Sequence, residues 1–279
     1  MLTLEHIAYS YHKGIHALND INATIDPGIH ILMGENGAGK TTLLHLLAGL
    51  LTPTEGTAAL DETDLADRTP VSLQRRFILD ENAFFPGRSI NTFARMHSRF
   101  YPTFNTEKFQ RNLEAFGMTG NEAFTRLSLG QSKKARLAYA LSLGVDLLLL
   151  DEPTNGLDID SKVVLRQLIA ESIDDGQYII VSTHTVSELD RLYDGVIILD
   201  HGHLVLNDNA WHIAEKIAFV HSTLPAKHPL YEEQEIGLFH SIVTNPGGKI
   251  ESKVDFRLLY SALRSPARNN ILQLITSEK

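Results

Sequence analysis

The chain has 279 residues and no cysteine, which excludes disulfide bridges, thiolate metal sites and cysteine nucleophiles. Apolar residues make up 43% of the chain and charged residues 21%, so it can bury a normal globular core. The formal net charge of −9 argues against a protein that binds bare nucleic acid, because such proteins usually present a basic face. The N-terminal segment lacks a basic region followed by an apolar core, so we expect no secretory signal, and the apolar runs are too short to cross a bilayer.

Short apolar runs alternate with longer helical patterns from about residue 30 to residue 200. Near-continuous apolar runs of this length are typical of strands covered on both faces. The predicted strands lie around 30–33 and at 76–79, 147–151, 178–182 and 196–199, and the predicted helices at 40–50, 105–116, 131–143, 161–174 and 185–192. This alternation predicts the α/β class, with a mostly parallel sheet and helices on both faces.

Two segments depart from the alternation. Residues 88–145 contain no convincing strand, so we expect a helical subdomain there. The pattern changes after residue 206, and we expect a nucleotide-binding domain over 1–210 and a small α+β module over 211–279. In that module, IAFVHS and LFHSIV are predicted strands, VDFRLLYSALRS is a predicted helix, and KHPLYEEQ and TNPGGK are predicted loops.

The stretch GENGAGKT at 34–41 lies between a predicted strand and a predicted helix, the context that a G-x-x-x-x-G-K-[ST] phosphate loop requires. Its glycines let backbone N–H groups turn inward as an anion-binding nest, and the helix N-terminus adds partial positive charge. Lys40 is suited to reach the β- and γ-phosphates of a nucleotide, and the Thr41 hydroxyl to ligate Mg²⁺. The alternative is a glycine-rich turn that only begins a helix.

The stretch LLLLDEP at 147–153 places Asp151 at the carboxyl end of a buried strand, where open α/β sheets bind ligands. Asp151 is suited to hold Mg²⁺, and Glu152 to accept a proton from an attacking water. The strand at 178–182 leads to His184, whose imidazole can sense a γ-phosphate. The alternative for LLLLDEP is a strand that simply ends in a polar turn, which the presence of the phosphate loop disfavours. The alternative for His184 is an ordinary loop histidine.

The stretch LSLGQ at 127–131 has two interpretations. Locally, Ser128 and Gln131 form the S-x-x-Q capping box of a helix start. Globally, the amides at that helix start are one wall of a nucleotide site.

Taken in order, GENGAGKT (34–41), LSLGQ (127–131), LLLLDEP (147–153), NGLD (155–158) and STH (182–184) resemble the motifs of the ABC ATPase family across roughly residues 2–206. The resemblance implies a P-loop NTPase core, the ligands ATP and Mg²⁺, and ATP-driven dimerisation in which LSLGQ faces the nucleotide of the opposite subunit. LSLGQ would then cap its own helix and also contact the nucleotide bound to the other subunit. The implied partners are a second nucleotide-binding subunit, as a homodimer or with a similar chain, and a separate transmembrane subunit that holds the protein at the cytoplasmic face of a membrane.

The resemblance also implies the role of individual residues. Glu152, His184 and Lys40 are expected to be catalytic, and Thr41, Asp151 and Asp80 to hold the metal. The expected nucleotide contacts are Tyr11, Asn36, Gly37, Ala38, Gly39, Lys40, Thr41, Thr42, Asp80, Ser128, Gly130, Gln131 and Asp158. Tyr9 is an alternative to Tyr11 as the aromatic residue that stacks on adenine, and Asp158 resembles the aspartate that links the two sites of a dimer.

Two positions depart from the family pattern. Leu129 stands where many members have glycine, and its apolar side chain must point away from phosphate. Asp80, followed by Glu81, stands where glutamine is usual; an ionised carboxylate only accepts hydrogen bonds but can approach Mg²⁺ or its water. Asp80 together with the stretch FYPTFN resembles exporter-type ATPases with a separate membrane chain.

We therefore expect an ATP-hydrolysing subunit of a transporter. The alternative is a soluble ABC ATPase acting on nucleic acid or the ribosome, but such members usually have two nucleotide domains or long coiled-coil insertions, and no direct contact with nucleic acid is expected here. A module that has lost hydrolysis is disfavoured by Lys40, Asp151, Glu152 and His184. Trp211, His201, His203 and His212 raise the question of a metal site, but their irregular spacing favours surface or packing roles.

Overall fold

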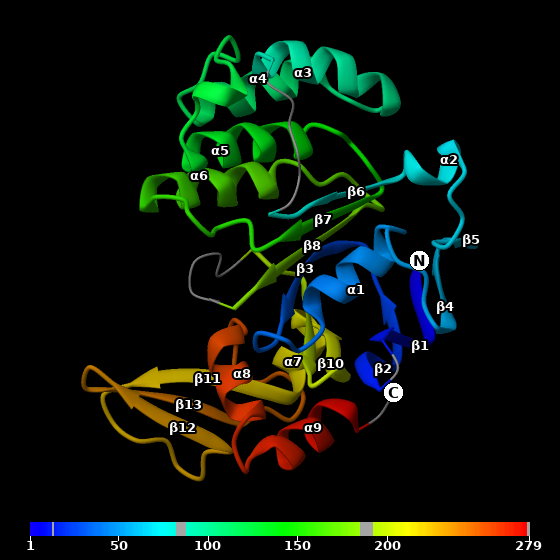
Figure 1. Ribbon diagram of the computed structural model, residues 1–279. Coiled ribbons are helices and arrows are strands. Elements are labelled where there is room, and N and C mark those ends of the chain that lie inside the picture. The colour runs from blue at the N-terminus through cyan, green and yellow to red at the C-terminus, as the bar shows by residue number, and fades with distance from the viewer. Residues whose placement is uncertain (13, 82–87, 185–191, 278–279) are drawn as a thin grey trace.

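The computed structural model describes residues 1–12, 14–81, 88–184 and 192–277. A six-stranded sheet with the order β10-β9-β3-β8-β7-β6 lies at the centre of the molecule (Figure 1). Its strands are β3 (Gly28–Met33), β6 (Arg76–Leu79), β7 (Leu147–Asp151), β8 (Tyr178–Thr183), β9 (Gly195–Asp200) and β10 (His203–Asn209). All neighbours pair in parallel except β10, which is antiparallel to β9 at the edge. The predicted α/β class and the predicted strands are confirmed.

Side chains of the central strands alternate between two hydrophobic cores. Leu148 and Leu150 of β7 belong to one core, and Leu147 and Leu149 belong to the other. Because successive side chains of a strand point to opposite faces, a strand covered on both faces must be apolar throughout. This arrangement accounts for the run LLLL that precedes Asp151.

Helices cover both faces of the central sheet. The helices α5 (Leu129–Ala140) and α6 (Ile159–Ala170) pack on one face (Figure 1). On the other face, α1 (Lys40–Leu47) lies between the central sheet and a four-stranded antiparallel sheet. That second sheet has the order β2-β1-β4-β5 and consists of β1 (Leu2–His12), β2 (Ile15–Ile25), β4 (Glu55–Leu60) and β5 (Thr63–Asp64). It is absent from the strands predicted above.

The segment 88–145 is helical, as predicted. It holds α3 (Ile90–His97), α4 (Thr106–Ala115), α5 and two 3₁₀ turns at Ser98–Phe100 and Phe124–Arg126. The short α2 (Pro70–Leu73) precedes β6. The helices α1, α5 and α6 end earlier than predicted; α1, for example, stops before Gly49, whose φ of +73° a helix cannot accommodate. Of the predicted helix at 185–192, residues 185–191 lie outside the described residues.

The C-terminal residues form a three-stranded antiparallel sheet, β11-β13-β12, with helices beside it. The elements are α7 (Ala210–Lys216), β11 (Ile217–Ser222), β12 (Tyr231–Glu235), β13 (Leu238–Thr244), α8 (Phe256–Leu263) and α9 (Arg268–Thr276). The predicted strands in IAFVHS and LFHSIV and the helix α8 are confirmed. The predicted loop KHPLYEEQ is wrong in part, because Tyr231–Glu235 is an edge strand, and charged residues of the kind that suggested a loop are common on such edges.

The boundary at residue 210 remains a prediction. Ile213, Ile217 and Phe256 belong to the same hydrophobic cluster as the strands of the central sheet. The C-terminal module is therefore packed onto the core rather than built around a core of its own. Among the described residues, no helix is both long and apolar enough to span a membrane.

Candidate nucleotide site

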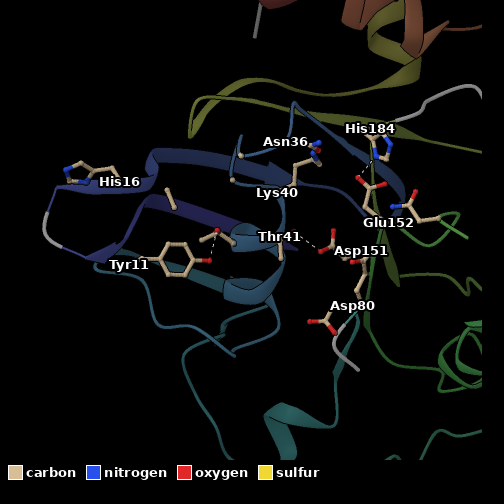
Figure 2. Close-up of a pocket in the computed structure, with 15 residues that line it drawn as sticks. Tyr11, His16, Asn36, Lys40, Thr41, Asp80, Asp151, Glu152 and His184 are labelled. Carbon is tan, nitrogen blue, oxygen red and sulfur yellow. Dashed lines mark hydrogen bonds and ion pairs between the residues drawn. The ribbon is translucent and has the colours of Figure 1, made fainter. Parts of the chain in front are cut away.

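The phosphate loop, residues 34–41, joins β3 to α1 at the carboxyl edge of the central sheet (Figure 2). Gly39 has a φ of +102°, and a Cβ there would lie 2.7 Å from the Ala17 carbonyl oxygen. Gly37 also has a positive φ, of +84°, but a Cβ would meet nothing within 4 Å. Gly39 is thus required both by backbone conformation and by space, whereas Gly37 is required by conformation alone.

Lys40 lies buried against the loop, with 7% of its surface exposed. Its Nζ donates hydrogen bonds to the carbonyl oxygens of Gly34 at 2.8 Å and Glu35 at 3.1 Å. Burial lowers the pKa of Lys40, while the charges of Glu152 and Asp151 act to raise it. Two of the three ammonium donors are used, so one remains for an anionic ligand.

Asp151, at the end of β7, is held from both sides. Thr41 Oγ1 donates to its Oδ2 at 2.7 Å, and the Ser182 hydroxyl of β8 donates to its Oδ1. The same Ser182 oxygen accepts a hydrogen bond from the Glu152 N–H at 3.0 Å. Ser182 therefore positions both carboxylate residues, a role that the sequence motif STH did not assign to it.

Glu152 has a left-handed backbone, with φ of +47°, which is uncommon for a residue other than glycine. Lys133 Nζ donates to its carbonyl oxygen at 2.6 Å, which helps to hold that conformation. Its Oε1 pairs with His184 Nδ1 at 2.9 Å, and its Oε2 is buried without a hydrogen-bond partner among the described residues. Glu152 thus offers one unused acceptor oxygen beside an imidazole that fixes the other.

These side chains face one pocket of about 640 Å³ (Figure 2). The pocket is lined by Tyr11, His16, Ala17, Asn36, Gly37, Gly39, Lys40, Thr41, Thr42, Asp80, Glu81, Asp151, Glu152, Asn155 and His184. Most of the predicted site residues are therefore brought together by the fold. His16, Ala17, Glu81 and Asn155 were not among the predicted site residues, and the first two belong to β2 of the antiparallel sheet, which was not predicted.

Tyr11 and Asp80 lie at two sides of this pocket in Figure 2. Tyr11 is half exposed and its Oη lies 3.0 Å from Thr42 Oγ1, whereas Tyr9 packs edge-to-face behind it and does not line the pocket. Asp80 Oδ2 lies 3.1 Å from Nε2 of His45, which extends from α1. Of the two tyrosines, Tyr11 therefore lines the pocket and Tyr9 does not.

The predicted contacts Ala38, Ser128, Gly130, Gln131 and Asp158 do not line the pocket. Ala38 is buried, with 4% exposed. Ser128 begins α5 with the capping box: its Oγ accepts from the Gln131 N–H at 3.2 Å, and the Gln131 side chain accepts from the Ser128 N–H at 3.0 Å. Within one chain, LSLGQ acts as a helix start.

The starts of α5 and α6 are joined on one exposed face. Asp158 caps α6 by accepting from the Ser161 N–H at 2.8 Å, and Lys134 Nζ of α5 lies 3.0 Å from its other oxygen. The Ser161 hydroxyl, that N–H and Lys134 together lower the pKa of Asp158. Leu129 is 93% exposed and does not line the pocket, but it lines an adjoining cavity that shares Asp80 and Asp151 with it.

The C-terminal module reaches the phosphate loop. The Arg264 guanidinium, just after α8, forms an ion pair with the carboxylate of Glu35. The residues first considered for a metal site do not gather: His212 Nδ1 pairs with Asp208 at 2.7 Å, His201 lies 3.8 Å from Asp200, and Trp211 is largely exposed. Those contacts agree with surface or packing roles.

A parallel sheet with a phosphate loop after β3 and an acidic end of β7 in the same pocket defines a P-loop nucleoside triphosphatase. Residues 18–155 match the family model described as "ABC transporter". The ABC transporter ATP-binding protein NatA of Bacillus subtilis is 31% identical over 202 residues, which are 69% of this chain and 82% of that protein. The energy-coupling factor transporter ATP-binding protein EcfA of Methanothermobacter thermautotrophicus is 29% identical over 216 residues, which cover 74% of this chain and 70% of that protein.

Solved structures of ABC transporter ATP-binding proteins have a similar fold. The cbiO1 protein of Clostridium perfringens, part of an ABC transporter complex, is 26% identical with a TM-score of 0.59, covering 75% of this chain and 88% of that one. An ATP-binding subunit of an ABC transporter has the same fold, with a TM-score of 0.68 at 23% identity over 76% of this chain and 91% of its own. The chain belongs to the family of ABC transporter ATPase subunits, whose activity is ATP hydrolysis.

Proposed function

We propose that the pocket in Figure 2 binds ATP with Mg²⁺ and hydrolyses the bond between its β- and γ-phosphates to drive a separate membrane subunit. One observation carries the proposal: the buried Lys40, the Thr41–Asp151 hydrogen bond and the Glu152–His184 pair line the same pocket.

The triphosphate binds along the phosphate loop. Backbone N–H groups of the loop and the N-terminus of α1 supply partial positive charge, and Lys40 supplies a full one. Tyr11, whose hydroxyl lies 3.0 Å from Thr42 directly after the loop, offers a half-exposed ring for the adenine. A buried cation next to an open glycine, Gly37, suits a polyanion that must approach the backbone closely.

The residues near Thr41 fit a magnesium ion. Mg²⁺ prefers oxygen ligands, and the Thr41 hydroxyl and the Asp151 carboxylate offer oxygens 2.7 Å apart, with Asp80 lining the same pocket. Thr41 and Asp151 would hold the ion, with Asp80 reaching it directly or through water. When bound, the ion neutralises charge on the phosphates.

Hydrolysis needs a group that accepts a proton from the attacking water. Glu152 lines the pocket and its Oε2 makes no hydrogen bond within the described residues, while His184 keeps the carboxylate in place through Oε1. As the water oxygen bonds to the γ-phosphorus and the bond to the β-phosphate oxygen breaks, Glu152 takes the water proton. His184, beside it, is suited to hydrogen-bond the γ-phosphate.

The residues of LSLGQ would act on the nucleotide of a second copy. Leu129 and Ile159, the first residues of α5 and α6, are 93% and 80% exposed, and the Lys134–Asp158 contact places these helix starts side by side. Two exposed apolar residues at neighbouring helix starts suit a face that a partner covers, even though both starts are capped within the chain. On this proposal, Ser128, Gly130 and Gln131 meet the partner's γ-phosphate, and Asp158 connects the two sites.

A separate transmembrane subunit and a place at the cytoplasmic face of the membrane complete the proposal. The nature of the relatives supports it, since they are ATP-binding proteins of transporters or part of a transporter complex. No observation favours the alternative that acts on nucleic acid or the ribosome, and the net charge of −9 opposes it.

Titration calorimetry with ATP and Mg²⁺ tests the binding site. Lys40→Ala removes the buried cation, so we expect ATP affinity to fall by at least tenfold. Lys227→Ala, which removes an exposed lysine of the C-terminal module, is the matched control and should bind as the parent does. Undiminished affinity in Lys40→Ala would place the nucleotide elsewhere.

A further inference from the structure

Three side chains with metal-ligand chemistry gather in the C-terminal module. They are His221 on β11, His240 on β13 and Asp255 before α8. The Nδ1 atoms of the two histidines lie 2.7 Å apart, and His221 Nε2 lies 3.9 Å from Asp255 Oδ2. One ligand atom from each residue lies within 4.8 Å of the others, and the described part of the chain holds no second group of this kind.

The fold fixes all three positions. His221 and His240 are directly paired across β11 and β13, so their side chains lie on the same face of the sheet. Asp255 is the N-cap of α8: its Oδ1 accepts from the Leu258 N–H at 2.8 Å. Its second oxygen, Oδ2, is the one nearest His221. The cap thus anchors the carboxylate while leaving one oxygen for a further ligand.

A fourth possible ligand, the carboxylate of Glu233, lies near these three residues but is already paired with other side chains. Glu233 on β12 is paired with His240 in the register, but Arg257 Nη1 lies 2.6 Å from its Oε1 and the Tyr231 hydroxyl donates to its Oε2 at 3.2 Å. Glu233 is therefore engaged and is not counted as a ligand. The side chain of His221 is 45% exposed, which leaves a path from solvent.

We propose that His221, His240 and Asp255 bind a divalent transition-metal ion of the Zn²⁺ type. Two imidazoles and a carboxylate suit such ions, and the chain has no thiolate that could compete for them. Zn–N bonds of about 2.0–2.1 Å in a tetrahedral site place two nitrogens about 3.3 Å apart, so the histidines need to separate by about 0.6 Å. Because His221 binds one ion through one nitrogen and Asp255 lies nearest its Nε2, the carboxylate must also move closer, from a spread of up to 4.8 Å between ligand atoms to about 3.3 Å. The alternative is a plain hydrogen bond, in which one Nδ1–H donates to the other ring.

The test uses the full chain without an affinity tag, freed of metal by EDTA and dialysis. Zn²⁺ is titrated at pH 7.5 by calorimetry, with Mg²⁺ in large excess throughout. The magnesium occupies oxygen-rich sites such as Asp151 but competes poorly for imidazole. We expect one Zn²⁺ per chain, a higher melting temperature with Zn²⁺, and nitrogen ligands in the zinc X-ray absorption spectrum.

Three variants decide the assignment. His240→Ala should lose the stoichiometric site and the zinc-dependent rise in melting temperature. Asp255→Asn keeps a good N-cap, so the fold is preserved, but it removes the charge and should weaken zinc binding by at least tenfold. His203→Ala, at an exposed histidine of β10, is the control and should bind as the parent does.

Two results would overturn the proposal. One is the absence of stoichiometric zinc binding by the parent chain, which would leave only a hydrogen bond between the two rings. The other is undiminished binding by both His240→Ala and Asp255→Asn, which would assign the zinc to other residues.

Discussion

Replacing Ser128 with alanine separates the two roles of the LSLGQ stretch. In the isolated chain the change removes one half of the capping box, the Gln131 N–H bond of 3.2 Å. Loss of such a cap costs about 0.5–2 kcal/mol of stability. Asn105→Ala is a matched control, because Asn105 caps α4 through the Lys108 N–H at 2.9 Å and is also exposed to solvent.

The two variants should differ in ATP-dependent dimerisation. If Ser128 also donates to the partner's γ-phosphate, each site loses a hydrogen bond to a charged group, worth about 1.5–3 kcal/mol. A symmetric dimer has two such sites, so the loss is about 3–6 kcal/mol, or roughly 10²–10⁴-fold in the dimer dissociation constant. Asn105→Ala should lower the melting temperature similarly and leave dimerisation unchanged.

Sedimentation velocity with ATP measures this difference. Both changes are made in a Glu152→Gln background, which slows hydrolysis and keeps ATP bound. Thermal melts of the same samples report the cost of each lost cap. Equal dimerisation by the Ser128 and Asn105 variants would refute a role in the partner's site and leave LSLGQ as a helix start.

Changes at three positions, Glu152, Tyr11 and Asp158, test the nucleotide pocket of the single chain and the cap of α6. Glu152→Gln should keep ATP binding but slow single-turnover hydrolysis by about 10²–10⁴-fold, and a parental rate would assign the water to another group. Tyr11→Phe should bind ATP nearly as the parent does in calorimetry while Tyr11→Ala binds more weakly, since the ring and not its bond to Thr42 contacts the base; equal affinities would contradict this. The folded pKa of Asp158 is lowered chiefly by Ser161, so its contribution to stability is fully present above about pH 4 and is lost progressively as the pH falls from there toward the folded pKa. Asp158→Asn, which also caps, should show a smaller drop in melting temperature between pH 6 and 3, and an unchanged drop would contradict that assignment.

The central sheet could be predicted because its strands are covered on both faces. A short, wholly apolar run such as LLLL before Asp151 is typical of a strand buried in this way. The antiparallel sheet could not be predicted by the same reasoning. The pairing of β1 with β2 shifts register repeatedly between Leu4 and His12, and these irregularities break the period-2 pattern on which strand prediction depends.

The residues of the site also fall into two groups, those that local sequence motifs predict and those that depend on how distant strands pack together. Lys40, Thr41, Asp151 and Glu152 follow from motifs that are continuous in sequence. His16 and Ala17 depend on how the second sheet folds over the loop, and no local pattern shows it. The His221–His240–Asp255 cluster was missed for a related reason. It depends on the register of β11 with β13, which sequence spacing does not provide.

Mixing two defective variants tests most directly whether each active site is shared between two copies. The Ser128→Ala chain keeps Lys40 and Glu152 in its own pocket but should fail to complete the partner's site. The Glu152→Gln chain lacks the proton acceptor in its own pocket but should still complete the partner's site through Ser128. In a mixed dimer, one site combines the intact Glu152 of the first chain with the intact Ser128 of the second. Steady-state ATP turnover of the mixture should therefore exceed the sum of the two separate rates, and a mixture that only reaches that sum would contradict the shared site.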